Sequence, residues 1–282
     1  MTITSIFRAM RANFKLGWDM EGNWAPPWLY LLISLAAPAA GTLMLVFMYL
    51  VILGNAADKT FLAFMIGGAA VFMFVKLVLA GAGWAVIEDR EHYKILRYIY
   101  IAPSPFPAQL LGRIGFKLIV AAFGSALTLL AGWLALGIPF QAGGIGWGTL
   151  FGSLVLGMIG MLALGWILAS SMLLVDRMGW VWAEGISGLL FLICGFFIPL
   201  SILPAPIAWV SRLLPLTYWT ELWRHALYGA TTALSLPNLT EGQLWVGLTV
   251  TSITTFVVAV GFYRISDWLA RRWGRIETET FY

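Results

Sequence analysis

Long apolar stretches alternate with short polar segments along the whole chain. Six such stretches lie at roughly 28–54, 61–87, 108–137, 146–175, 181–200 and 242–264. A helix of about 20 apolar residues is long enough to cross the hydrocarbon core of a bilayer. We therefore predict an all-α polytopic membrane protein with six transmembrane helices, which leaves little chain for a soluble domain.

The first apolar stretch is preceded by an amphipathic segment over residues 3–18. Projected as a helix, this segment separates an apolar face from a basic face. The apolar face contains Ile3, Phe7, Met10 and Phe14, and the basic face contains Arg8, Arg11 and Lys15. This pattern is typical of a helix that lies in the membrane interface. A disordered basic tail is the alternative.

The densest charge in the chain lies between the second and third apolar stretches, over residues 88–97. Its charged members are Glu88, Asp89, Arg90, Glu91, Lys94 and Arg97. The positions that follow helical spacing on an apolar face are His92, Ile95, Leu96 and Ile99. A short amphipathic helix at this place suits docking into a groove on a soluble partner. A solvated loop with ordinary flanking charges is an equally good interpretation.

The segment over residues 196–229 is apolar but contains four prolines, at 199, 204, 206 and 215. Proline in a helix interior breaks the helix, so one continuous span is excluded. We predict two short helices, about 205–213 and 217–228, that dip into the outer leaflet and re-emerge. Irregular backbone at that depth requires cover by protein or a water-lined cavity.

Composition and charge agree with a membrane protein and indicate its orientation. The 282 residues are 61% hydrophobic and include 15 Trp and 18 Phe, too many for a soluble chain to bury. With a cytoplasmic N-terminus, only Lys59, Arg212 and Arg224 among the basic residues of the loops and ends fall outside. This positive-inside bias predicts that both termini are cytoplasmic. The net charge of +4 is spread along the span ends, so we expect no nucleic-acid partner.

Several kinds of chemistry are excluded by the residues that the chain lacks. No G-x-x-x-x-G-K-[ST] sequence occurs, so the chain cannot form a P-loop for ATP. Cys194 is the only cysteine, and His92 and His225 are the only histidines. These numbers exclude an intrachain disulfide and a Cys- or His-rich metal centre. We expect no catalytic residues, no metal and no cofactor bound by this chain.

Two sets of charged residues lie at unusual places. Lys76 is about midway through the second span, where an ionisable group is costly and tends to be functional. Lys76 could snorkel, face a central cavity or pair with Glu184. Glu221 and Arg224 are three residues apart and could form a local pair, either as a structural clasp or as part of a gate.

The order of these features resembles a type 2 ATP-binding-cassette (ABC) permease, the membrane subunit of an exporter. Two passages carry the resemblance, which covers nearly the whole chain. The first is Glu88-Asp89-Arg90-Glu91, Lys94-Ile95-Leu96, Pro103 and Leu110-Leu111-Gly112-Arg113, similar to the family's coupling-helix region. The second is Phe197-Ile198-Pro199, Leu203-Pro204, Leu214-Pro215-Leu216-Thr217-Tyr218 and Arg224, similar to its outer re-entrant helices.

The resemblance implies a division of the chain and a set of functional residues. We expect an interfacial helix over 1–27, a transmembrane domain over 28–265 and a cytoplasmic tail over 266–282. Within the domain, a coupling helix would occupy about 88–102 and outer re-entrant helices about 201–229. The coupling residues would be Glu88, Asp89, Arg90, Glu91, Lys94, Ile95, Leu96, Arg97 and Ile99. The substrate pathway or outer gate would include Lys76, Pro204, Pro215, Tyr218, Glu221 and Arg224.

The resemblance also implies partners and a location. Separate ABC ATPase subunits would bind ATP and Mg, and a second permease, the same chain or a related one, would complete a dimer. The expected location is the cytoplasmic membrane of a prokaryote, in contact with membrane lipids. We expect the substrate to be a small amphipathic drug, antibiotic or lipid, with a lipid-linked glycan as the alternative. An ion-gradient-driven secondary transporter is the rival class, and a membrane subunit without a transport path is a third.

Overall fold

The computed structural model describes residues 3–23, 25–54, 58–101, 105–141, 144–175, 178–229, 232 and 234–274. Over these residues it contains 11 α-helices and no strand. Pro103, Arg177 and the end of the predicted tail, residues 275–282, lie outside the described residues. So do the side chains of Ile3 and Arg97.

The helices follow the apolar stretches and the polar segments between them. The α-helices are α1 Ile3–Glu21, α2 Pro27–Leu53, α3 Lys59–Phe74, α4 Ala80–Ile87, α5 Leu96–Ile101, α6 Phe106–Leu136, α7 Trp147–Met172, α8 Gly179–Ile193, α9 Ala205–Ser211, α10 Pro215–Tyr228 and α11 Glu241–Arg272. Two π-helical turns, η2 Val75–Leu79 and η3 Glu88–His92, continue α3 and α4, and a 3-10 turn, η4 Leu200–Ile202, precedes α9. The two short helices expected before the last span are thus present as α9 and α10.

Polar caps and prolines fix where several of these helices begin. The Asp58 side chain accepts a hydrogen bond from the backbone N–H of Thr60 at the start of α3. Thr240 and Gln243 form a reciprocal capping box at the start of α11. Proline occupies the first turns of α2, α6, α9 and α10, where its missing N–H costs nothing.

Four helical segments are long and apolar enough to cross a membrane unaided: Lys59–His92, α6, α7 and α11. The two parts of α2, Pro27–Ala36 and Ala39–Ile52, are bent by 41° and give a fifth candidate if they form one span. The fifth apolar stretch, expected to span over 181–200, is helical only from Gly179 to Ile193. Those 15 residues extend about 22 Å, less than the hydrocarbon core of about 30 Å. The described residues therefore contain four to five candidate spans, fewer than the six predicted.

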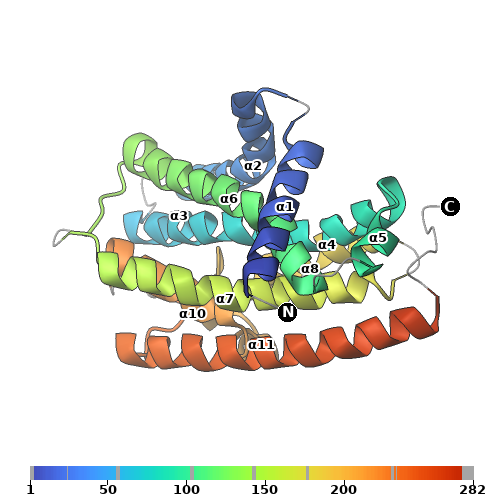
Figure 1. Cartoon of the computed structure of the whole chain (residues 1–282). Coiled ribbons are helices and arrows are strands. Elements are labelled where there is room, and N and C mark those ends of the chain that lie inside the picture. Colours follow the sequence, from blue (N-terminus) through green and yellow to red (C-terminus); the bar gives the residue numbers. More distant parts are fainter. Residues whose placement is uncertain are drawn as a thin grey trace.

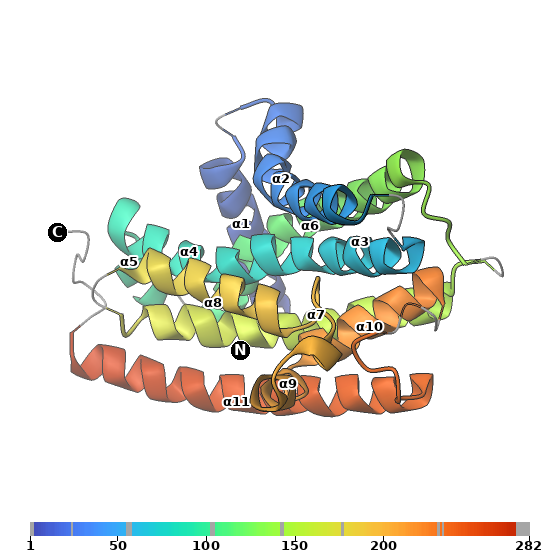
Figure 2. The same ribbon diagram turned by 180° about the vertical axis from the view of Figure 1, so that it is seen from behind.

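The spans form a layered bundle in which α7 packs between α11 and the η2–α4 part of Lys59–His92 (Figure 1). α1 crosses α6 and α7 steeply on one side of this bundle, and α2 lies over α3 and α6. α8, α9 and α10 cover the opposite side (Figure 2). Of the most apolar window of Lys59–His92, 83% is buried, against 28% for α6 and for α11. The Lys59–His92 segment is therefore the central element, and α6 and α11 are peripheral.

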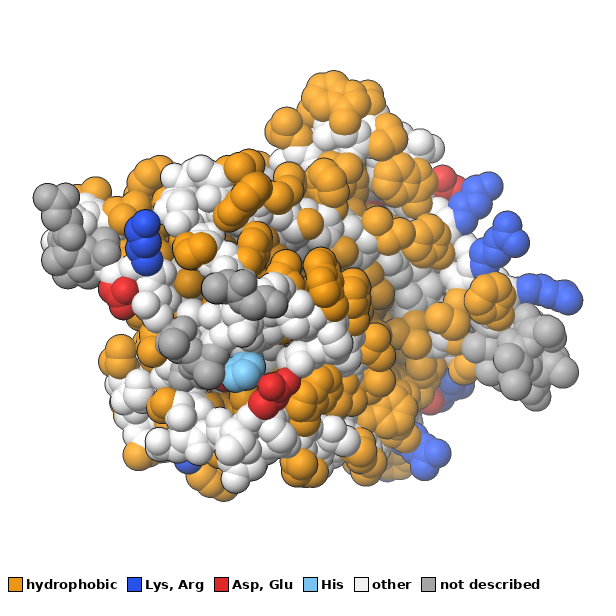
Figure 3. All heavy atoms as spheres, turned by 90° about the vertical axis from the view of Figure 1, so that its left-hand side faces the viewer, with side chains coloured by type: hydrophobic (Ala, Val, Ile, Leu, Met, Phe, Trp, Pro, Cys, Tyr) orange, Lys and Arg blue, Asp and Glu red, His pale blue; other side chains and the backbone are white. Residues whose placement is uncertain are grey.

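The outer surface is largely apolar. Figure 3 faces the end of the molecule at which α3 and α11 begin and shows hydrophobic side chains over much of the surface, with few charges. Val51, Leu134 and Met44 are each more than 70% exposed. Large exposed apolar side chains are unfavourable in water but favourable in contact with lipid acyl chains.

Candidate functional site

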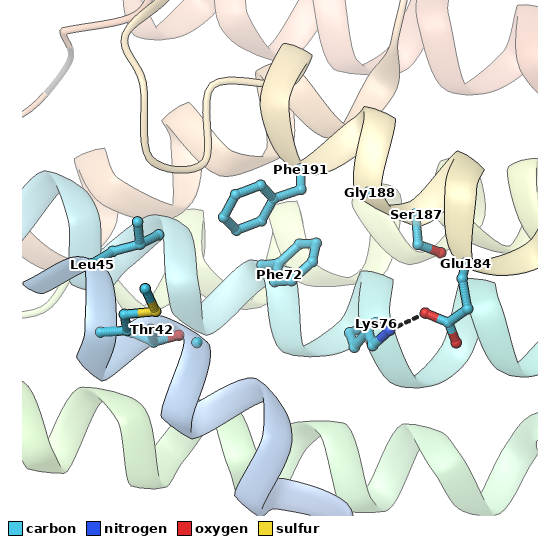
Figure 4. Close-up of a pocket in the computed structure, with 10 residues that line it drawn as sticks. Thr42, Leu45, Phe72, Lys76, Glu184, Ser187, Gly188 and Phe191 are labelled. Carbon is cyan, nitrogen blue, oxygen red and sulfur yellow. Dashed lines mark hydrogen bonds and ion pairs between the residues drawn. The ribbon is translucent and has the colours of Figure 1, made fainter.

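Lys76 lies in η2, a π-helical turn inside the longest helical segment. Such turns interrupt the regular rotation of a helix and often occur at functional sites. Lys76 Nζ donates a hydrogen bond to Glu184 Oε2 on α8 (Figure 4). Trp84 Nε1 donates to the other carboxylate oxygen of Glu184 at 3.1 Å. Of the three roles considered for Lys76, the pairing with Glu184 is confirmed.

The ion pair lies on the wall of a cavity of about 530 Å³ between α2, the α3–η2 segment and α8. The cavity is lined by Gly41, Thr42, Met44, Leu45, Phe72, Lys76, Glu184, Ser187, Gly188 and Phe191. The rings of Phe72 and Phe191 meet edge to face, with centroids 4.8 Å apart (Figure 4). The cavity is thus mostly apolar, with one ion pair and two hydroxyl groups.

The Lys76–Glu184 pair remains accessible from this cavity. The side chains are 32% and 39% exposed, and a paired charge costs far less in an apolar setting than an isolated one. A charged group of a ligand could therefore contact Lys76 or Glu184 while the two residues remain paired with each other. The volume falls in the range of small-molecule sites.

The second pair, Glu221 and Arg224 on α10, is completely buried. Arg224 Nη1 donates to Glu221 Oε2 at 3.1 Å, and Arg224 Nε donates to the carbonyl oxygen of Phe64 on α3 at 3.0 Å. Arg224 Nη2 donates to the carbonyls of Gly195 and Phe196 at 2.8 and 2.7 Å. Arginine keeps its proton in proteins, so the buried guanidinium is a charge that the Glu221 carboxylate compensates.

Glu221 extends the same network to the loop before α11. Its Oε1 accepts the backbone N–H groups of Ser235 and Leu236, both at 3.0 Å. Neither Glu221 nor Arg224 lines the cavity around Lys76. The geometry therefore supports a structural clasp that joins α3, α10, the turn after α8 and the loop before α11.

The remaining residues expected in the outer gate also lie away from the cavity. Pro204 starts α9 and is exposed, whereas Pro215 starts α10 and packs against Gly160 of α7. The ring of Tyr218 packs against Gly247 of α11. None of the three contributes to the lining around Lys76.

The expected coupling helix over 88–102 is wrong in its bounds. Residues 88–92 continue the long helical segment as η3, and a break follows at 93–95, where Lys94 has φ +54°. Only Leu96–Ile101 forms a separate helix, α5. A positive φ is strained for a residue with a side chain, so a single regular helix cannot pass through Lys94.

The first charged residues of this region make internal contacts, and Asp89 and Arg90 are buried while Glu88 is partly exposed. Arg113 Nη2 of α6 lies 3.0 Å from Glu88 Oε2 and 3.4 Å from Asp89 Oδ1. Arg90 Nη2 lies 2.8 Å from Glu91 Oε1. Arg90 Nη1 also donates to two backbone carbonyls at the end of α7, at 3.0 and 3.1 Å. Glu88, Asp89 and Arg90 therefore join the end of the long helix to α6 and to the end of α7.

The apolar face expected to dock is also directed inward. Leu96 is only 2% exposed, and Ile99 is half-buried against the core. The exposed apolar residues of α5 are Tyr98 and Ile101, at 54% and 79%. Tyr100 stacks on Phe106 of α6, and burial raises the pKa of its hydroxyl above the ordinary value. The sequence predicted that a partner protein covers this face of α5, whereas in the structure the face packs on the rest of the chain.

Sequence reasoning did not single out Arg113 as a partner of the acidic run, nor Lys117 as a partner of α1. Lys117 Nζ lies 2.7 Å from Glu21 Oε2 at the end of α1. Both residues could have been noticed in the sequence, because two cations four residues apart in an otherwise apolar helix lie on the same face. Within the described ranges, no three His, Cys, Asp or Glu side chains are grouped so as to hold a metal ion.

Comparison with known proteins identifies the family of the chain. The model of the ABC-2 type transporter membrane domain matches residues 22–228. This range includes the Lys76–Glu184 cavity, the η3–α5 region and the Glu221–Arg224 clasp. No curated protein matches the chain at a significant level.

Proposed function

Because the chain belongs to the ABC-2 transporter family, as its membrane permease, we propose that it forms the substrate pathway of an ATP-driven exporter as a dimer. The permease domain of this family has no ATPase activity, and ATP binds to separate ABC ATPase subunits with which these permeases pair. ATP binding and hydrolysis on those subunits would drive the movement of this chain. The second permease would be another copy or a related chain.

The proposed topology has six spans with both termini in the cytoplasm. α2, Lys59–His92, α6, α7 and α11 would each cross the bilayer, and α8 together with the turn after it would complete the sixth crossing. α1, within residues 1–27, would lie in the interface, the transmembrane domain would cover 28–265, and residues 266–282 would form a cytoplasmic tail. α9 and α10, within 201–229, would be re-entrant helices on the outer side. The four prolines between residues 194 and 215 support this arrangement, since they prevent one continuous helix.

Coupling to the ATPase would use the η3–α5 region. The exposed face of α5, with Tyr98 and Ile101, would contact the ATPase, and Lys94 would lie at the rim. When α5 moves, the contacts of Glu88 and Asp89 with Arg113 would transmit this movement to α6. This proposal keeps the expected coupling region but assigns different residues to contact and to transmission.

The Lys76–Glu184 cavity carries the proposal about the substrate. Aromatic rings and aliphatic groups would hold the apolar part of an amphipathic compound, while the ion pair would bind a charged or polar group. A glycan would need many hydrogen-bonding partners, and beside the ion pair this wall has only the hydroxyls of Thr42 and Ser187. The lining thus favours a small amphipathic drug, antibiotic or lipid.

The test is transport by the permease reconstituted with the ATPase that co-purifies with it. Gly188→Trp fills the cavity from α8, and Gly185→Trp places the same side chain on the same helix outside the cavity lining. A Cβ at either glycine meets nothing within 4 Å, so both variants should fold. We expect Gly188→Trp to abolish ATP-dependent movement of a fluorescent amphipathic cation while Gly185→Trp retains it. Equal transport by the two variants would contradict the pathway, and transport driven by an ion gradient without ATP would contradict the exporter.

A further inference from the structure

A second cavity, separate from the proposed pathway, lies on the side of the bundle that α1 crosses. It has a volume of about 490 Å³ and is formed by the start of α6, the second half of α7 and one residue each of α1 and α11. Its walls include Leu111, Leu162 and Trp166, with Met10 of α1 and Phe256 of α11 at its edges. The lining side chains contain no charged group. The cavity is therefore suited to a hydrocarbon chain.

The position of α1 beside this cavity is fixed by close backbone packing on α6. A Cβ added at Gly112 of α6 would lie 2.4 Å from the carbonyl oxygen of Met10, and one added at Gly17 of α1 would lie 2.5 Å from the carbonyl oxygen of Arg113. Phe14 also packs on Gly115. Any larger residue at these glycines would push the helices apart, so α1 is a fixed edge of the cavity.

The opening of the cavity towards lipid is apolar, whereas the exposed charged residues of α1 beside the cavity are mostly basic. Ile159 and Phe256, at 45% and 47% exposed, open the cavity towards surrounding lipid. On α1, Arg8, Arg11 and Lys15 are all exposed, and they lie within five residues of Met10, which lines the cavity. The acidic Glu21 of α1 is already paired with Lys117, and exposed Asp19 lies one turn beyond Lys15.

We propose that this cavity binds one acyl chain of an anionic phospholipid whose headgroup is held by the cations of α1. Since the chain is a multi-pass membrane protein, lipid surrounds it on all lateral faces, and an open apolar groove would be filled by acyl chain. A basic interfacial segment attracts anionic lipid with a free energy that corresponds to about fivefold in binding for each cation. The site would fasten α1 to α6, the helix that carries Arg113 and Lys117. This inference depends on membership of a membrane-protein family and not on the proposed substrate.

The first experiment is native mass spectrometry of the full-length protein in detergent, titrated with palmitoyl-oleoyl phosphatidylglycerol or phosphatidylcholine. We expect saturable binding of phosphatidylglycerol that Leu162→Trp removes by filling the groove. Val155→Trp, at a lipid-facing position of the same helix outside the groove, is the control and should bind normally. Replacing Arg8, Arg11 and Lys15 by Gln should lower the preference for phosphatidylglycerol about fivefold for each cation removed, whereas Arg212→Gln should not change it.

A second measurement detects lipid in the wild-type groove, so it does not depend on correct folding of Leu162→Trp or of the Gln variants. Phosphatidylglycerol with brominated acyl chains should quench a saturable part of the tryptophan fluorescence, and that part should be missing in Trp166→Phe. Equal binding of the two lipids by the wild-type protein would overturn the proposal and indicate annular lipid only. Unchanged binding in Leu162→Trp, or unchanged quenching in Trp166→Phe, would equally overturn it.

Discussion

The buried clasp on α10 gives the most demanding test of the packing described above. Arg224→Met removes the guanidinium but keeps an unbranched apolar side chain in its place. The change leaves the Glu221 carboxylate without its cation and removes the hydrogen-bond donor of the carbonyls of Phe64, Gly195 and Phe196. All of these groups lie where water cannot replace the lost donor, since both side chains of the pair are 0% exposed.

The expected loss can be estimated from the burial of the pair. Removing one partner of a buried ion pair costs about 3–5 kcal/mol, because the other charge stays uncompensated. The matched control is Arg271→Met on α11, where Arg271 is 57% exposed and pairs with Asp267 at 3.0 Å. Removal of an exposed pair costs only about 0.2–1 kcal/mol. The same substitution should therefore have clearly different effects at the two positions.

The single cysteine provides the assay. Cys194 is buried at the end of α8, next to Gly195, whose carbonyl is held by Arg224. A maleimide can label it only when this region opens. If opening is fast and reversible, the labelling rate follows the opening equilibrium. Arg224→Met should then raise the rate roughly a hundredfold to several-thousandfold, whereas Arg271→Met should raise it less than about tenfold.

The double variant Glu221→Gln/Arg224→Met separates loss of the charge balance from loss of packing. Its neutral amide oxygen can still accept the N–H groups of Ser235 and Leu236, and no unpaired charge remains. We expect it to be labelled more slowly than Arg224→Met alone. If Arg224→Met is labelled no faster than Arg271→Met, the clasp does not stabilise the fold and the argument from burial is refuted.

Three further predictions concern coupling, packing and topology. Leu96→Asp should reduce the yield of folded protein. Ile101→Asp should leave the fold intact and release the ATPase in a pull-down. If neither variant releases the ATPase, α5 does not belong to the interface. Gly157→Ala should lower the thermal midpoint, since its Cβ would lie 2.2 Å from an indole of α10, at a cost of about 1–3 kcal/mol, while Gly148→Ala, in open space, should not. In a cysteine-free background, Asp58→Cys should react with a membrane-impermeant maleimide on intact cells, and labelling only after cell disruption would invert the proposed orientation.

The hydrophobic pattern alone determined the fold class and the position of most helices. The length of an apolar run is set by the bilayer and by the rise of the helix, so α2, α6, α7 and α11 lie close to where the sequence predicts them. The prolines that start α9 and α10 were also informative, because their effect on a helix is local. The resemblance to the transporter family depended on the order of such local features, and the family match confirms it.

Periodicity could not decide which neighbour covers an apolar face. The spacing of Leu96 and Ile99 looks the same whether they meet an ATPase or α6, and the structure directs them inward. The break at Lys94 was also missed, since no glycine or proline marks it and its positive φ is a property of the folded backbone. The sequence therefore predicted an outward apolar face at Leu96 and Ile99, whereas the structure packs both against the core.

The charged pairs show the same division. Glu221 and Arg224 are three residues apart on one helix, so their pairing could be predicted from helix geometry alone. Their bonds to α3, to the turn after α8 and to the loop before α11 join residues far apart in the chain. Lys76 and Glu184 are 108 residues apart, and a π-turn and the packing of α8 bring them together. The sequence by itself determined which segments are apolar and mostly helical, because that depends on local composition. Only the tertiary structure decided which of their residues meet, because that depends on how separate helices pack.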